Sequence, residues 1–163
     1  MINIQFKKLH EDAELPTLGS IDAACFDLVI TDIDHMDMNP NFVTLKYGFA
    51  TAIPKGYKAV IIPRSSFTHR GWVMANSPGQ IDSDYRGEWI SKLEAIPEHW
   101  SDYQHQLQYP DFPYAIGDRA SQFYIEKIVK VEFSEVDELY KTKRGAGGFG
   151  STDKKNKEDE ENL

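Results

Sequence analysis

Residues 79–88 read Gly79-Gln80-Ile81-Asp82-Ser83-Asp84-Tyr85-Arg86-Gly87-Glu88. Two glycines enclose two carboxylates, a phenol and a guanidinium, a composition typical of a β-hairpin that carries a polar site. Because alternate residues of a strand point to one face, we expect Asp82 and Asp84 to project to the same side. A carboxylate beside an aromatic ring is suited to orienting a water molecule and to stacking a sugar. The stretch therefore predicts one wall of a ligand pocket.

A second polar stretch, Pro63-Arg64-Ser65-Ser66, lies just upstream. Its hydroxyl groups and its guanidinium fork suit a phosphate group. Taken alone, such a stretch is more often a serine-capped turn than an anion site. With Asp82 and Arg144 in the same chain, we favour the anion site. The two stretches together then predict a nucleotide pocket in which hydrolysis takes place.

Most of residues 1–133 favours short strands separated by glycine and proline turns. Segments that alternate in polarity, or that are rich in β-branched and aromatic residues, lie at 2–6, 42–45, 58–62, 122–125 and 128–133. Regularly spaced short strands predict an all-β sandwich or jelly roll, which we assign to a domain over residues 1–140.

Two segments depart from this pattern. Pro97 and Glu98 suit the first turn of a helix over 97–108, so we expect a short helical insertion within the aromatic-rich segment at about 93–115. Residues 32–37 hold three aspartates but fail the spacing of a calcium loop, which favours a solvated loop there.

The C-terminal part changes in composition. Residues 141–152 are basic and then rich in glycine, and we expect a flexible arm whose Arg144 and Phe149 reach a ligand, with a plain linker as the alternative. Residues 153–163 are charged and nearly free of apolar side chains, which predicts a disordered tail.

Bulk properties limit the function classes. The chain has 163 residues and a net charge of −8, without the basic stripe of a nucleic-acid binder. Its single cysteine, Cys25, excludes an intrachain disulfide framework and a cysteine-rich zinc site. Residues 1–8 lack the long apolar stretch expected of a signal peptide, and no run approaches the ~20 apolar residues of a membrane helix. We expect a cytoplasmic protein, in the host-cell cytoplasm if it is viral, that binds neither nucleic acid nor a membrane.

Five segments, in this order, resemble the motifs of the trimeric dUTPases, the dUTP nucleotidohydrolases. They are residues 23–28 (Ala-Ala-Cys-Phe-Asp-Leu), 63–66 (Pro-Arg-Ser-Ser), 79–87, 117–122 (Gly-Asp-Arg-Ala-Ser-Gln) and 144–152 (Arg-Gly-Ala-Gly-Gly-Phe-Gly-Ser-Thr). The third and fifth are the most specific. Without the family context, residues 117–122 would fit a turn with a surface ion pair equally well.

The resemblance implies a β jelly roll of the β-clip type, assembled as a homotrimer with active sites at the subunit interfaces. It also implies the activity, a Mg²⁺-assisted hydrolysis of dUTP to dUMP and pyrophosphate, which lowers dUTP and supplies dUMP for thymidylate synthesis.

The resemblance further assigns roles to individual residues. Asp82 orients the water that attacks the α-phosphorus, and Asp27 holds Mg²⁺ through water. Tyr85 packs beneath the deoxyribose and excludes a 2′-hydroxyl. The remaining substrate contacts fall on residues that read the uracil, hold phosphates or close the arm, namely Asn76, Gln80, Ile81, Arg64, Ser65, Ser66, Gln122, Arg144, Phe149 and Gly150.

The chain departs from the family pattern at Cys25, Ser66 and Asp153, where glycine is usual. The connection over residues 89–116 is longer than usual, as in some phage members, and we expect it to form an exposed flap that binds a partner protein. Two other functions stay open: a dCTP deaminase, alone or bifunctional, and a regulatory protein that keeps the fold and binds a partner through residues 93–115.

Overall fold

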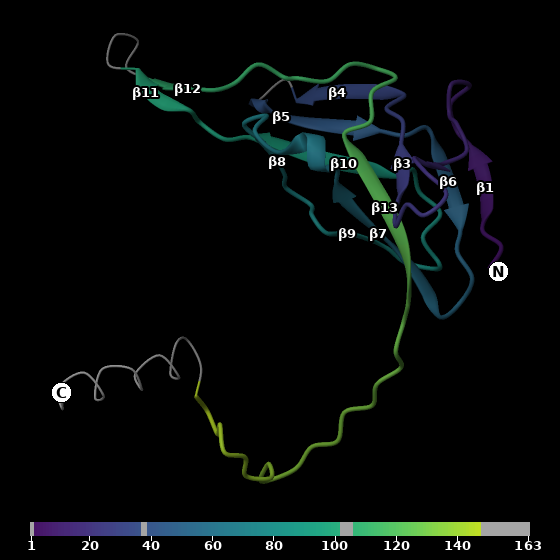
Figure 1. The fold of residues 1–163 in the computed structure, drawn as a ribbon, viewed down its shortest axis with the longest axis vertical. Helices are drawn as coiled ribbons and strands as arrows, with labels where there is room; N and C mark the ends of the chain where they lie inside the picture. The colour runs from purple at the N-terminus through teal and green to yellow at the C-terminus, as the bar shows by residue number, and fades with distance from the viewer. Residues whose placement is uncertain (1, 37–38, 102–105, 148–163) are drawn as a thin grey trace. The chain divides into compact units, whose positions relative to one another are not determined.

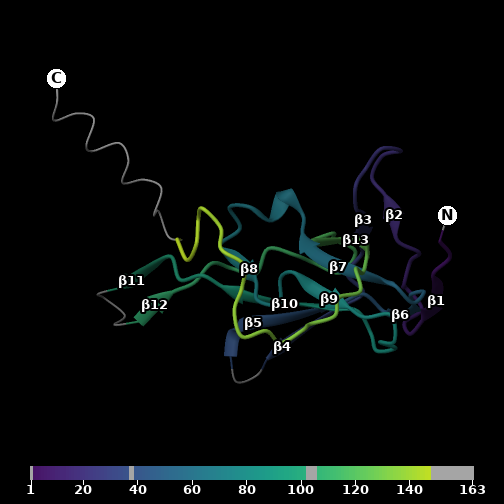
Figure 2. The same ribbon diagram turned by 90° about the horizontal axis from the view of Figure 1, so that it is seen from below.

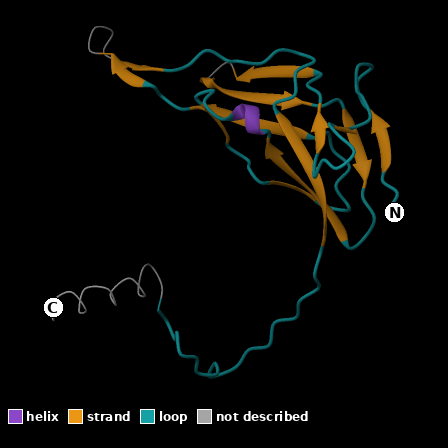
Figure 3. Ribbon diagram, viewed as in Figure 1, coloured by secondary structure: helices purple, strands orange, loops and turns teal. Residues whose placement is uncertain are grey.

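The computed structural model describes residues 2–36, 39–101 and 106–147. The chain forms two units, residues 1–129 and residues 130–163. Strands make up nearly all of the regular structure in the first unit (Figures 1 and 3). No helix in the described ranges is long and apolar enough to cross a membrane.

The strands are short and follow one another through tight connections. In chain order they are β1 Gln5–Lys8, β2 Thr17–Leu18, β3 Phe26–Leu28, β4 Asp32–Met36, β5 Asn39–Lys46, β6 Phe49–Ala52, β7 Tyr57–Pro63, β8 Trp72–Met74, β9 Gly79–Ile81, β10 Ile90–Ala95, β11 His99–Ser101, β12 Gln106–Gln108 and β13 Ser121–Lys127. A single 3₁₀ turn, η1 at Ser65–Phe67, is the one helical element among the described residues.

Two sheets form the body of the first unit. One has the strand order β2-β3-β13-β7-β9 and the other the order β4-β5-β10-β8. Their inner faces share one hydrophobic core, in which the rings of Trp89 and Phe123 meet edge to face at 4.9 Å. The expectation of an all-β jelly roll is confirmed, and the segments expected at 42–45, 58–62 and 122–125 lie within β5, β7 and β13.

A buried polar chain ties the two sheets together. The Tyr47 hydroxyl donates a hydrogen bond to Oγ of Ser91 at 2.6 Å, and Ser91 shares a second bond with Ser121 at 3.2 Å. Ser91 lies on β10 and Ser121 on β13, so the chain crosses from one layer to the other. Burial raises the pKa of Tyr47 to about 12, because the ionised phenol would lose its hydration.

The helix expected over 97–108 is wrong. The described part of that segment holds two antiparallel strands, β11 and β12, with Trp100 opposite Leu107. The Glu98 N–H donates to the Gln108 carbonyl at 2.8 Å and extends the pairing. Cross-strand contacts between large side chains outweigh the weak helix-start signal of Pro97. The hairpin projects away from the two sheets (Figures 1 and 2).

Two further sequence expectations are wrong. Residues 32–36 form strand β4, not a loop, because Ile33 faces Leu45 across the ladder and Lys46 pairs with the carboxylates of Asp32 and Asp34. Residues 128–133 form no strand, because no neighbouring strand in the described part of the chain pairs with them. The Phe133 side chain is 94% exposed.

Candidate active site

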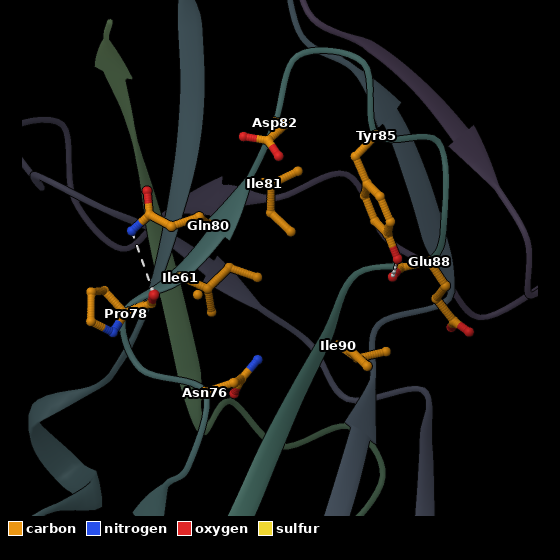
Figure 4. Close-up of a pocket in the computed structure, with 10 residues that line it drawn as sticks. Ile61, Asn76, Pro78, Gln80, Ile81, Asp82, Tyr85, Glu88 and Ile90 are labelled. Atoms are coloured by element: carbon orange, nitrogen blue, oxygen red, sulfur yellow. Dashed lines mark hydrogen bonds between the residues drawn. The ribbon is translucent and has the colours of Figure 1, made fainter.

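A polar pocket of about 320 Å³ surrounds strand β9 (Figure 4). Its apolar floor comes from Ile61 of β7 and Ile90 of β10. The other lining residues are Asn76, Pro78, Gly79, Gln80, Ile81, Asp82, Tyr85 and Glu88. The pocket therefore gathers Asn76, Gln80, Ile81, Asp82 and Tyr85, five of the residues that the sequence singled out.

The hairpin expected at residues 79–88 is wrong in form. Strand β9 pairs with β7, whereas β10 pairs with β5 and β8, so residues 82–89 form a loop between the two sheets. The Tyr85 N–H donates to the Asp82 carbonyl at 3.2 Å and closes a turn. Asp82 lines the pocket and Asp84 does not, so the two carboxylates do not share one strand face.

Asn76 is fixed at the base of the pocket. Its Oδ1 accepts a hydrogen bond from the Lys92 N–H at 2.9 Å, which leaves the amide nitrogen on the pocket side (Figure 4). Gly79 lies against it, because a Cβ at Gly79 would meet the Asn76 carbonyl oxygen at 3.4 Å and Nδ2 at 3.6 Å.

Tyr85 is held by a relay of contacts. Its hydroxyl donates to the Glu88 carbonyl at 3.1 Å, and Oε1 of Glu88 accepts from the Gly48 N–H at 2.9 Å. Gly87 lies directly under the phenol, where a Cβ would overlap the hydroxyl and the ring carbon that bears it. Arg86 donates to the carbonyls of Ser83 and Tyr85, each at 2.8 Å. The loop therefore presents the Tyr85 ring in one orientation.

The sequence did not reveal the supporting roles of Arg86 and Glu88. Glu88 and its partner Gly48 stand 40 residues apart in the chain, and only the folded connection between β5 and β6 brings them together. Gly48 has a φ of +67°, and a side chain there would meet His10 and Thr31. No local sequence signal indicates this contact.

A second polar group lies where β3, β7 and β13 meet. Nε of Arg64 is 3.0 Å from Oδ1 of Asp27, and the Gln122 amide donates to the Pro63 carbonyl at 3.2 Å. Gln122 is also the register partner of Asp27. Ser65 and Ser66 follow in η1 and are exposed. Asp27, Arg64, Ser65, Ser66 and Gln122 are thus brought together.

One chain does not bring the two groups to each other. Asp82 follows Ile81, which pairs with Ala59 of β7, whereas Arg64 lies beyond the far end of that strand. At about 3.3 Å per residue, the five steps from Ala59 to Arg64 span roughly 17 Å. The Asp82 pocket and the hollow that Arg64 lines share no residue.

The C-terminal unit holds the remaining predicted site residues. Nε of Arg144 donates to the Gly147 carbonyl at 2.8 Å, and the Gly147 N–H donates to the Arg144 carbonyl at 3.0 Å. Gly145 has a φ of +54°, which this turn requires. Phe149 and Gly150 lie outside the described residues.

The described carboxylates do not form a cluster of metal ligands. Within residues 2–36, 39–101 and 106–147, no three His, Cys, Asp or Glu side chains gather as metal ligands would. Asp27 is the partly buried carboxylate nearest the proposed phosphate residues, with 15% of its side chain exposed. A divalent cation here would need further oxygen ligands from a bound substrate and water, which is the usual arrangement for Mg²⁺.

Comparison with known proteins supports one family. A dUTPase family profile matches residues 11–92. The deoxyuridine 5′-triphosphate nucleotidohydrolase of Helicobacter pylori strain P12 is 35% identical over 153 residues, covering 93% of this chain and 97% of the relative. The enzyme of the same name from Hydrogenobaculum sp. strain Y04AAS1 is 39% identical over 148 residues, covering 90% and 94%.

Solved structures show the same fold. A variant of the Staphylococcus bacteriophage 80alpha dUTPase with dUpNHpp superposes with a TM-score of 0.71 at 21% identity, covering 93% of this chain and 99% of that one. A variant of the phage phi11 dUTPase, described with a structural Mg(II) ion, gives 0.64 at 21% identity, covering 86% and 100%. Profile, relatives and fold agree, and the chain belongs to the dUTPase family.

Proposed function

We propose that this protein hydrolyses dUTP to dUMP and pyrophosphate in the cytoplasm, lowering dUTP and supplying dUMP for thymidylate synthesis. The observation that carries the proposal is the pocket around β9, which sets the Asp82 carboxylate, the Tyr85 ring and the Asn76 amide around one cavity of about 320 Å³. Family membership supports the substrate, and the pocket supplies groups for its uracil, its sugar and its attacking water.

Asp82 is the proposed catalytic residue. Its carboxylate orients a water molecule and accepts its proton as the water oxygen attacks the α-phosphorus. The new bond joins that oxygen to the α-phosphorus, and the bond between this phosphorus and the bridging oxygen to the β-phosphate breaks. Pyrophosphate leaves with the bonding electrons, and the proton passes from Asp82 to solvent. The reaction needs no covalent enzyme intermediate.

The base and sugar would lie against the pocket wall. The Asn76 amide, with backbone groups at Gln80 and Ile81, reads the uracil edge. The Tyr85 ring would pack beneath the deoxyribose and leave no room for a 2′-hydroxyl. The hydrogen bond from its hydroxyl to the Glu88 carbonyl and the close approach of Gly87 support this role, because they fix the ring.

The phosphates would lie against Arg64, Ser65, Ser66 and Gln122. Asp27 is the carboxylate that fits Mg²⁺ there through water, because it is partly buried and adjoins these groups. When bound, Mg²⁺ would neutralise the triphosphate and stabilise the leaving pyrophosphate. Arg144 would bind the γ-phosphate. Phe149 and Gly150 would cover the uracil as the arm closes and excludes water.

The separation of the two polar groups supports a site shared between copies. In one chain, Ile81, which precedes Asp82, lies roughly 17 Å along β7 from the level of Arg64, since a strand rises about 3.3 Å per residue. A single nucleotide meets both groups when the Asp82 pocket of one copy faces the Arg64 group of another. A closed ring of three copies would repeat this contact at every interface, giving a homotrimer with interfacial active sites.

Pyrophosphate release tests the activity directly. We expect Mg²⁺-stimulated release from dUTP but not from dCTP, dTTP or UTP, and loss of the signal with excess chelator. Ammonia release from dCTP would instead support a deaminase. Absence of both reactions would favour the regulatory protein.

The hairpin β11–β12 is the proposed site for a protein partner. Trp100 and Leu107 form a cross-strand pair and are 56% and 43% exposed. The base of the hairpin is structural, because the Trp72 indole donates to the Asp111 carbonyl at 3.1 Å and packs against Phe112. Replacing residues 99–108 by a short turn therefore spares the core. We expect unchanged dUTP hydrolysis with loss of partner capture, and loss of folding would assign the hairpin a structural role.

A further inference from the structure

The turn η1, which carries Ser65 and Ser66, has few internal contacts of its own. The Phe67 N–H donates to the Arg64 carbonyl at 2.9 Å. The Thr68 N–H donates to the Ser65 carbonyl at 3.1 Å, and no side chain among the described residues caps the start of the turn. Hydrogen-bond geometry in a short 3₁₀ turn is poorer than in an α-helix, so the position of η1 depends on the packing of its one buried residue, Phe67.

Phe67 packs against Tyr114, which follows the hairpin β11–β12 in the chain. The two ring centroids are 5.8 Å apart and the ring planes differ by 18°, which is a stacked arrangement. Phe67 belongs to η1, whereas Tyr114 lies in the connection from β12 to β13. The stack therefore links the proposed phosphate turn to the base of the hairpin.

The Tyr114 ring is itself fixed by further aromatic contacts. Its centroid lies 6.0 Å from that of Phe112, whose ring meets Trp72 edge to face at 5.2 Å. Trp72 is a buried residue of β8, and its indole N–H donates to the Asp111 carbonyl at 3.1 Å. Side chains packed in this way have few alternative rotamers. The Tyr114 ring therefore offers Phe67 a surface in a defined position.

The segment that follows η1 is held between the two sides of the hairpin base. The Ile96 N–H, between β10 and β11, donates to the Gly71 carbonyl at 2.8 Å. Gly71 has a φ of +70°, and a Cβ there would meet Cγ of Pro110, just after β12, at 2.7 Å. Glycine suits both the backbone conformation and the close approach. Residues 65–71 are thus in contact with the hairpin base at both ends.

The stack involves the Tyr114 ring and not its hydroxyl group. The hydroxyl oxygen is inaccessible to solvent and makes no hydrogen bond to any described residue. Burial raises the pKa of Tyr114, so the phenol is neutral at physiological pH. Replacement by phenylalanine should therefore keep the stack, whereas replacement by leucine removes it.

We propose that Tyr114 is a positioning residue for the phosphates of the nucleotide, because its ring holds Phe67 and Phe67 holds the turn that carries Ser65 and Ser66. The inference rests on the proposed function, in which these two serines contact phosphates. A displaced turn would weaken the hold on a triphosphate. It would leave the uracil and sugar contacts unchanged, since the Asp82 pocket and the turn share no residue.

Binding titrations of the full-length protein with dUpNHpp and with deoxyuridine, which lacks phosphate, test this division. Tyr114→Leu should weaken dUpNHpp binding by about fivefold to tenfold, the scale of a lost aromatic pair, and leave deoxyuridine binding within about twofold of wild type. Tyr114→Phe should bind both ligands as wild type does. Tyr57→Leu, a control at the end of β7 remote from η1, also removes a partly buried tyrosine and should change neither affinity.

A double-mutant cycle separates the contact from general destabilisation, which a thermal melt of each variant measures. Phe67→Leu should weaken dUpNHpp binding by a factor similar to that of Tyr114→Leu. The double variant should bind little more weakly than either single variant, because both changes remove the same contact. Losses that multiply in the double variant would show that the two residues act independently and would overturn the inference.

Hydrogen exchange gives a readout that does not require a nucleotide. The Phe67 and Thr68 amides should exchange faster in Tyr114→Leu than in Tyr114→Phe, because η1 then opens more often. Unchanged exchange in Tyr114→Leu, or unchanged dUpNHpp affinity despite faster exchange, would overturn the positioning role. Faster exchange in Tyr114→Leu, together with a wild type that binds no dUpNHpp, would instead sink the proposed function and leave the support of η1 by Tyr114 standing.

Discussion

Arg64 and Asp27 form an ion pair, with Nε of Arg64 3.0 Å from Oδ1 of Asp27. The pair joins the residue proposed to hold phosphate with the residue proposed to hold Mg²⁺ through water. Their side chains are 35% and 15% exposed, so each charge is partly withdrawn from water and stabilised by the other. On substrate binding, the Arg64 guanidinium would bind a phosphate in place of Asp27. The Asp27 carboxylate would then be free to bind the hydrated cation.

Asp27→Asn should weaken the Mg²⁺ response. The amide cannot supply the negative charge that attracts the hydrated cation, so the Mg²⁺ concentration for half-maximal pyrophosphate release should rise by about tenfold or more. Asp34→Asn is the matched control, since Asp34 pairs with Lys46 at 3.7 Å and its side chain is 58% exposed. An unchanged Mg²⁺ titration in Asp27→Asn would remove Asp27 from the metal site.

Asp82→Asn should abolish most turnover while preserving dUTP affinity. Loss of a positioned base lowers kcat by about 100-fold or more, whereas binding depends on other pocket residues. Asp84→Asn is a close control, because Asp84 lies two residues away and does not line the pocket. Stopped-flow pyrophosphate release and calorimetry measure the two effects, and a nearly normal kcat in Asp82→Asn would take Asp82 out of the catalytic role.

Gly87→Ala should reduce discrimination between dUTP and UTP. The added Cβ would overlap the Tyr85 hydroxyl and displace the ring proposed to exclude the 2′-hydroxyl. We expect the ratio of kcat/KM for the two nucleotides to fall by about tenfold, equivalent to roughly 1.4 kcal/mol of lost discrimination. Gly19→Ala, where nothing lies within 4 Å of the new carbon, should leave the ratio unchanged. Equal ratios in the two variants would refute this role of Tyr85.

Tyr47 predicts an alkaline loss of stability. The folded chain keeps the phenol proton up to about pH 12, whereas the unfolded chain releases it from about pH 10. The higher pKa in the folded state means that deprotonation destabilises the folded chain relative to the unfolded chain. The stability associated with the protonated Tyr47 phenol is therefore fully present below pH 10 and is lost as the pH rises to 12. In urea unfolding, the free energy of unfolding should fall more steeply over this window in wild type than in Tyr47→Phe, by about 2 to 3 kcal/mol. Parallel curves would show that the phenol does not carry this pH dependence.

The sequence predicted the positions of the strands better than it predicted which strands pair. Residues 58–62 and 122–125 carry β-branched and aromatic residues, and they pair as β7 and β13 in the centre of one sheet. The same local signal misplaced residues 128–133, because a strand needs a pairing edge as well as a suitable composition. Residues 79–88 were expected to form a hairpin because local composition does not reveal which strands pair. In the structure, Ile81 pairs with Ala59 and Ile90 with Lys46, and both partners are remote in sequence.

The sequence identified the residues of the candidate site but not how they are arranged in space. Motif resemblance singled out Asp27, Arg64 and Asp82, but nothing in their spacing indicated that Arg64 would pair with Asp27 and lie far from Asp82. Glu88 and Arg86 support the pocket through hydrogen bonds to backbone carbonyls and to the Gly48 N–H. Every residue carries a backbone carbonyl, and every residue except proline carries an N–H, so no residue type marks these contacts in the sequence. Such contacts follow from the fold alone.

Subunit complementation tests the shared active site most directly. Asp82→Asn and Arg64→Gln should each be inactive as pure proteins, because every site then lacks one essential group. Unfolded together in equal amounts and refolded, they should regain about a quarter of wild-type activity, since random mixing gives each site both native residues with that frequency if they come from different copies. No recovery in mixed oligomers verified by native mass spectrometry would show that Asp82 and Arg64 act within one chain, and would contradict the shared site.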